Sequence, residues 1–76
     1  MEDLKTALAH YIGDIYTSGD YSMFIDEDDM YDELFSDAMY KVRKDIEQFN
    51  YDYELEATIE QIDSIKQDDI DWKKVF

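Results

Sequence analysis

The sequence contains no cysteine and no proline, and only two of its 76 residues are glycine. Without cysteine, the chain has neither a disulfide nor a thiolate ligand for a metal. Without proline, and with so little glycine, it has few residues that end a helix or favour a turn. The composition therefore favours helices joined by short connections, and the length suits a single domain, residues 1–76, with one modest core.

Basic residues are also scarce. Seven lysines and arginines stand against 21 aspartates and glutamates, which gives a formal net charge of −14. A small domain usually carries a net charge of magnitude about 2–8, and a larger charge destabilises the folded state by self-repulsion. High charge with low apolar content would indicate disorder. Here 45% of the residues are hydrophobic and 16% are aromatic, so we expect the chain to fold around its aromatic side chains.

Long hydrophobic runs are missing as well. No apolar stretch approaches the ~20 residues that a membrane-spanning helix needs, and the first residues lack the pattern of a signal peptide. Anionic lipid headgroups would also repel an acidic surface. We therefore expect no membrane contact and a cytoplasmic location, which is the host cell cytoplasm if a phage encodes the protein.

The hydrophobic pattern predicts the first helix clearly. Over residues 3–17, apolar side chains recur at steps of three and four and form one stripe. Gly19 is expected to end this helix in the left-handed conformation. Residues 19–27 are expected to form a loop that places Phe24 or Ile25 under the neighbouring helices.

A second, longer stripe predicts a helix with its N-cap at Asp28 and its end at Asn50. The spacing also allows an Asp37–Lys41 ion pair on its surface. A third helix is predicted over residues 52–66. Its expected inward residues are Leu55, Ile59, Ile62 and Ile65, and the tail is expected to dock Ile70, Trp72 and Phe76. The predicted fold is all-α, a small three- to four-helix bundle with a strongly acidic surface.

Patterns that carry chemistry are weak in this sequence. His10 is the only histidine, and it has no second histidine or cysteine to help it hold zinc. The acidic run that starts at Asp26 fails as an EF-hand loop, because Met30 and Tyr31 stand where a ligand and a glycine are required. Carboxylate catalysis needs a concave pocket, which a domain this small rarely encloses. We predict no enzyme activity, no metal and no cofactor.

The acidic residues are unevenly distributed. Nine of them, and no basic residue, lie between Asp14 and Tyr40, and seven more lie between Asp45 and Ile65, again without a basic residue. A surface that only keeps a protein in solution interleaves the two signs. We therefore expect the acidic surface to serve a function.

Helical spacing aligns some of these acids. Asp29, Glu33 and Asp37 lie at i, i+4 and i+8, about 6 Å apart on one face, and a similar row is expected between Glu56 and Asp63. Phosphates along a DNA strand are separated by on the order of 6–7 Å. Two rows on neighbouring helices, about 8–10 Å apart, would therefore resemble a nucleic-acid backbone. The predicted partner-binding residues are Asp26, Glu27, Asp28, Asp29, Asp32, Glu33, Asp37, Asp52, Glu56, Glu60 and Asp63.

In length, lack of cysteine, and richness in Asp, Glu and Tyr, the chain resembles small acidic DNA mimics of phages and mobile elements. These include the phage overcome-restriction protein and several anti-CRISPR proteins. The resemblance covers the whole composition and is closest over residues 26–35, but these families share no motif from which functional residues can be assigned. It implies an inhibitor that occupies the basic nucleic-acid-binding surface of a host defence complex, a CRISPR effector or a restriction enzyme, without binding nucleic acid itself.

Two alternatives stay open. An immunity protein or antitoxin would neutralise one basic nuclease through a few aromatic contacts, with a milder dependence on salt. A structural adaptor would homodimerise through its aromatic residues, and pairing of two copies would also lengthen the acidic surface of a mimic. Tyr21, Tyr51 and Tyr53 are the aromatic residues that we expect to be exposed and to anchor a partner.

Overall fold

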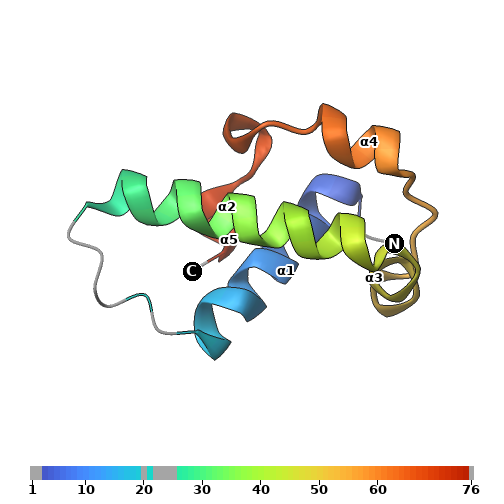
Figure 1. The fold of residues 1–76 in the computed structure, drawn as a ribbon, viewed down its shortest axis with the longest axis horizontal. Coiled ribbons are helices and arrows are strands. Elements are labelled where there is room, and N and C mark those ends of the chain that lie inside the picture. Colours follow the sequence, from blue (N-terminus) through green and yellow to red (C-terminus); the bar gives the residue numbers. More distant parts are fainter. Residues whose placement is uncertain (1–2, 20, 22–25, 76) are drawn as a thin grey trace.

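Every element of the computed structural model is helical within the residues it describes, which are 3–19, 21 and 26–75. In Figure 1 the longest helix crosses the middle of the molecule. This result confirms the all-α fold predicted from the sequence. The elements are α1 (Leu4–Ser18), α2 (Glu27–Lys44), α3 (Ile46–Tyr53), α4 (Ile59–Ser64), the 3-10 helix η1 (Gln67–Asp69) and α5 (Trp72–Val75).

Helix α1 forms where its apolar stripe predicts it. The Asp3 carboxylate caps its start by accepting a hydrogen bond from the Thr6 backbone N–H at 2.8 Å. This bond holds the pKa of Asp3 below its ordinary value, because it favours the ionised form. Leu8 and Ile12 of the stripe have no exposed surface. The stripe therefore faces the core along the helix.

The end of α1 differs from the prediction. Gly19 has φ −107° and ψ 173°, an extended conformation, so the predicted left-handed glycine is wrong. A Cβ atom at this position would lie 2.7 Å from Cε2 of Tyr21. The Tyr21 ring therefore lies close against Gly19, and no positive φ requires a glycine here. Phe24 and Ile25, which we expected to tuck under the helices, lie outside the described residues.

Helix α2 begins and ends earlier than predicted. Its N-cap is Asp26 rather than Asp28, and the Asp26 carboxylate accepts from the Asp28 backbone N–H at 2.9 Å. The helix ends at Lys44 rather than Asn50, because Asp45 adopts φ −139° and ψ 63°. Asp45 then caps α3 by accepting from the Gln48 backbone N–H at 3.4 Å. One predicted helix is therefore two.

The predicted helix over residues 52–66 is also wrong. Helix α3 ends at Tyr53, Glu54 takes the left-handed conformation at φ 55°, and residues 55–58 are not helical. A new helix, α4, starts after Thr58, whose side chain forms a capping box with Gln61. Ile59, predicted to point inward, is 39% exposed.

One hydrophobic cluster takes buried residues from all five α-helices. Gly13 lets α5 approach α1, because a Cβ there would lie 2.8 Å from the Val75 carbonyl oxygen. As predicted, the tail docks Ile70, which is 4% exposed, and Trp72, which stacks on Tyr31 with ring centroids 4.5 Å apart. Phe76 lies outside the described residues.

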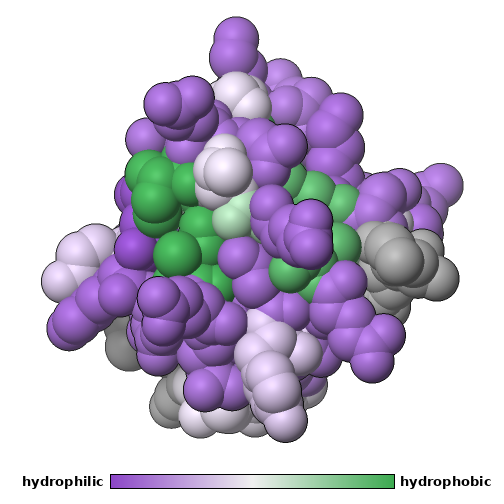
Figure 2. All heavy atoms as spheres, turned by 90° about the vertical axis from the view of Figure 1, so that its right-hand side faces the viewer, coloured by the Kyte–Doolittle hydropathy of each residue, from purple (hydrophilic) through white to green (hydrophobic). Residues whose placement is uncertain are grey.

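Two further observations concern the distribution of hydrophobic residues. Figure 2 views the end of the molecule that carries α3 and α4, where hydrophobic side chains gather near the middle of a mostly hydrophilic face. Within the part of the chain that the structure describes, none of the helices has both the length and the apolar character needed to cross a membrane.

Candidate partner-binding surface

The N-terminal half of α2 presents a dense group of carboxylates. The buried side of this helix is apolar, and Leu34, Ala38 and Val42 have no exposed surface. The acids of this half of the helix lie off the buried side, and each is exposed except Asp37, which is half-buried. We call this group the α2 acidic face: Asp26, Glu27, Asp28, Asp29, Asp32, Glu33 and Asp37.

Within this face, the helix confirms the predicted alignment of Asp29, Glu33 and Asp37, which we call the α2 acidic row. All three lie in one unbroken helix, so their side chains recur every ~6 Å along it. Acids in the first turn gain from the helix dipole, but Glu33 and Asp37 lie beyond that turn. Their i, i+4 repulsion is a cost that the helix bears without compensation from the dipole.

The row has no cationic partner among the described residues. The one ion pair that joins two described residues links Arg43 Nη1 to Asp63 Oδ1 at 3.4 Å. The Asp37–Lys41 pair that the spacing allows is therefore not formed. The charges of the α2 acidic row are left for solvent, or for a partner, to screen.

An aromatic side chain lies beside the row. The pKa of Tyr21 is raised, first by burial and then by the negative charges of Asp37 and Glu33. The Tyr21 ring also stacks on Tyr16 of α1, with centroids 5.9 Å apart. The end of α1 and the acidic row therefore border one another, and Tyr21 is half-buried rather than freely exposed.

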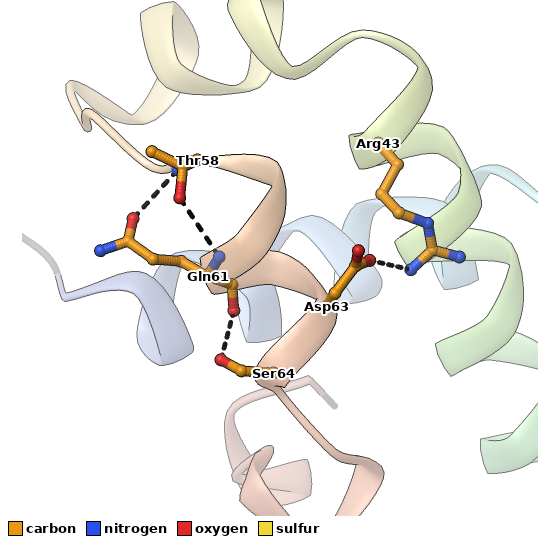
Figure 3. A network of polar contacts seen from close by, with 5 residues as sticks. All are labelled: Arg43, Thr58, Gln61, Asp63 and Ser64. Carbon is orange, nitrogen blue, oxygen red and sulfur yellow. Dashed lines mark hydrogen bonds and ion pairs between the residues drawn. The ribbon is translucent and has the colours of Figure 1, made fainter.

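The second predicted row does not form. Glu56 lies in the non-helical connection, so only Glu60 and Asp63 lie on α4. Asp63 points toward Arg43 of α2 (Figure 3). Arg43 lies about 9 Å further along the helix axis than Asp37, so α4 packs beside the basic end of α2. The two acidic rows predicted to be neighbours are not side by side.

Asp52 lies apart from both groups. It is exposed on α3 and accepts a hydrogen bond from Gln48 Nε2 at 2.8 Å. Its charge, with that of Asp45, helps to raise the pKa of Tyr11, for which burial is the larger cause. Asp52 therefore borders the aromatic contact of Tyr11 with Phe49, whose ring centroids are 5.5 Å apart.

The exposed aromatic residues differ in part from the expected ones. Tyr51 is 81% exposed, as predicted. Tyr53 is half-buried, and its hydroxyl donates to Asp14 Oδ2 at 3.3 Å. Sequence reasoning missed Tyr40, which is 61% exposed and has the Lys44 ammonium 5.8 Å from its ring centroid. The available signal for its exposure was its position in the sequence, between an acidic stretch and a basic stretch.

The described residues also bear on metal binding. Among them, no three His, Cys, Asp or Glu side chains converge in a way that would hold a metal ion. His10 is exposed on α1. Comparisons with protein-family models, curated proteins and solved structures each give no match to this chain. A function for it must therefore be inferred from its charge and geometry.

Proposed function

We propose that this protein is a DNA-mimic inhibitor that occupies the basic nucleic-acid-binding surface of a host defence complex, a CRISPR effector or a restriction enzyme. One observation carries the proposal. The α2 acidic face lies along one helix and is exposed apart from the half-buried Asp37, and none of its carboxylates forms an ion pair with another described residue. Charges in this state are available to Lys and Arg side chains that normally bind phosphates.

The spacing on α2 supports mimicry over a short length. The α2 acidic row extends for about 12 Å, which matches roughly three successive phosphates at 6–7 Å spacing. Asp28 and Asp32 form a second i, i+4 pair on the same helix, rotated by about 100° from the row. The second line of charge is therefore supplied by α2 itself and not by a neighbouring helix.

Electrostatic attraction would make such an inhibitor associate rapidly with its target. A surface of one sign steers an oppositely charged partner and raises the association rate. A partner rich in Lys and Arg would also relieve the repulsion between Asp29, Glu33 and Asp37, which the free protein bears. Because the contact is electrostatic, we expect binding to weaken steeply between about 50 and 200 mM salt.

The first test is capture of partners from a lysate of the natural host, with duplex DNA added as competitor. We expect the captured proteins to be nucleic-acid-binding defence proteins, and we expect added DNA to displace them from this protein. This protein should also inhibit their cleavage of DNA. Capture that DNA does not displace would contradict the proposal.

The second test separates position from net charge. The triple variant Asp29→Lys, Glu33→Lys, Asp37→Lys should lose inhibition while its circular dichroism still shows helix. A matched control adds Lys5→Glu, Lys66→Glu and Lys73→Glu to that triple variant, which restores the net charge to −14. If the α2 acidic row is the contact, this control still fails to inhibit. Restored inhibition would show that only net charge matters.

The exposed tyrosines favour a second candidate, an immunity protein for a basic nuclease. Tyr51 and Tyr40 are 81% and 61% exposed, and exposed aromatic side chains are common anchors in tight interfaces. In that case, Tyr51→Ala or Tyr40→Ala would weaken binding by more than the triple charge reversal does. The dependence of binding on salt would be shallow.

A further inference from the structure

The α3–α4 end of the molecule exposes one apolar side chain that is not packed on the core, beside two that are partly buried against it. Ile59, the first residue of α4, is 39% exposed and is not among the residues packed on the hydrophobic core. Leu55 and Ala57 precede it and are half-buried. We call these three residues the α3–α4 apolar patch. Figure 2 shows hydrophobic side chains gathered on this face.

The patch is held in a fixed shape. The Asn50 side chain donates to the Ala57 carbonyl oxygen and accepts from the Ala57 backbone N–H, both at 2.9 Å. The Leu55 N–H bonds to the Asn50 carbonyl oxygen at 2.9 Å. The Thr58 hydroxyl accepts from the Gln61 N–H at 3.2 Å, and the Gln61 side chain accepts from the Thr58 N–H at 3.0 Å (Figure 3). A surface that is ordered in advance loses less entropy when a partner binds.

Carboxylates surround the patch along the chain. Glu54, Glu56 and Glu60 are exposed and alternate with its apolar residues. None of them forms an ion pair with a described residue. Glu47 and Asp52 add exposed charge on α3. An apolar centre with unpaired carboxylates next to it along the chain is complementary to an apolar stripe flanked by Lys and Arg.

We propose that the α3–α4 apolar patch docks a basic amphipathic helix of a partner protein. Its apolar stripe would lie on Ile59 and Leu55, and its Lys and Arg side chains would reach Glu56 and Glu60. This is a second surface, because α3 and α4 lie toward the end of the molecule opposite the start of α2 (Figure 1). The proposal therefore does not depend on DNA mimicry by the α2 acidic face.

Charge argues against two other occupants. A two-fold contact between copies would place the same patch on both sides of the interface. Glu54, Glu56 and Glu60 of each copy would then face like charges, which opposes pairing of the two copies. A membrane surface carries anionic headgroups and would repel the same rim.

The test uses two synthetic peptides of leucine and lysine, each about 18 residues or five helical turns long. In one peptide the leucines form a single helical stripe, and in the other the same residues are scrambled. Binding to the full chain is measured by isothermal titration calorimetry and mapped by NMR amide shifts. We expect the amphipathic peptide to bind roughly tenfold more tightly than the scrambled one and to shift the amides of residues 55–60. Equal binding of the two peptides would overturn the proposal.

The decisive variant is Ile59→Asp. It adds a negative charge, which alone would strengthen attraction to a basic peptide, so a loss of roughly tenfold in affinity would report the lost apolar contact. Ile59 is exposed at the start of a helix, where aspartate is tolerated, and circular dichroism checks the fold. Unchanged affinity in Ile59→Asp would overturn the proposal, as would self-association that this variant abolishes in sedimentation.

A last control separates the two surfaces. The charge-matched variant, which combines the reversal of Asp29, Glu33 and Asp37 with Lys5→Glu, Lys66→Glu and Lys73→Glu, should leave affinity for the amphipathic peptide within about twofold, a small change on the free-energy scale. If that variant abolishes peptide binding, the peptide occupies the α2 acidic face and the patch proposal fails. If the reversal keeps full inhibition of a defence enzyme while Ile59→Asp loses peptide binding, DNA mimicry fails and the patch proposal stands.

Discussion

The α2 acidic face and the connection between α3 and α4 are both rich in carboxylates, but they are held in different ways. Helix α2 rests on fully buried side chains such as Leu34 and Val42, and its acids keep the regular spacing of the helix above them. Residues 55–58 rest on hydrogen bonds from the side chains of Asn50 and Thr58. The packing beneath a segment therefore decides whether its charges form a row, since exposed acids have little preference of their own.

Breaking the packing under α2 should have the largest effect. Leu34 has no exposed surface, so Leu34→Ala removes buried methyl groups and leaves a cavity. We expect it to lower the free energy of unfolding by about 2–5 kcal/mol, measured by urea denaturation. Ser36→Ala, on the exposed side of the same helix, should change it by less than about 0.5 kcal/mol. Equal effects of the two variants would show that α2 is not anchored by its apolar side.

Breaking the hydrogen bonds under the connection should have a smaller effect. Asn50→Ala leaves the half-buried Ala57 N–H and carbonyl oxygen without their partner, which we expect to cost about 1–3 kcal/mol. Gln48→Ala also removes an amide, but one that bonds the exposed Asp52, and should cost under about 1 kcal/mol. Urea denaturation compares the two variants. A similar loss in both would mean that the Asn50 bonds do not hold the connection.

The smallest predicted effect is a gain in stability. Glu33 is the middle member of the α2 acidic row, so Glu33→Gln removes both i, i+4 repulsions at once. We expect a gain of about 0.4–1 kcal/mol at low salt that shrinks as salt is added. Thermal unfolding at two salt concentrations measures it. Glu47→Gln on α3 has no acid four residues away and should give no gain. A loss of stability in Glu33→Gln would show that the row is not under repulsive strain.

Local sequence signals predicted part of the fold. Helix α1 and the buried side of α2 follow an apolar stripe long enough to outweigh any local alternative. The break at Asp45 was missed because the stripe runs through it from Val42 to Phe49 without interruption. A capping aspartate competes with the helix there. The start of α4 did carry a signal, since Thr58 and Gln61 have the spacing of a capping box.

The features of the candidate surfaces also differ in whether local sequence signals could predict them. The α2 acidic row was predictable, because spacing within one helix follows from its sequence positions alone. The pairing of Asp63 with Arg43 and the exposure of Ile59 were not, because each depends on where α4 packs against the rest of the chain. The functional assignment stays a proposal for both surfaces.

The sequence by itself determined the charge of −14, the all-α fold and the acidic row along α2. The charge is a sum over the composition, whereas helix formation and the alignment of the row depend on residues within about four positions of one another. Only the tertiary structure decided that α4 lies against the basic end of α2 and that Ile59 faces solvent. Contacts between segments distant in sequence depend on how whole elements pack around the shared core, and no local pattern encodes them.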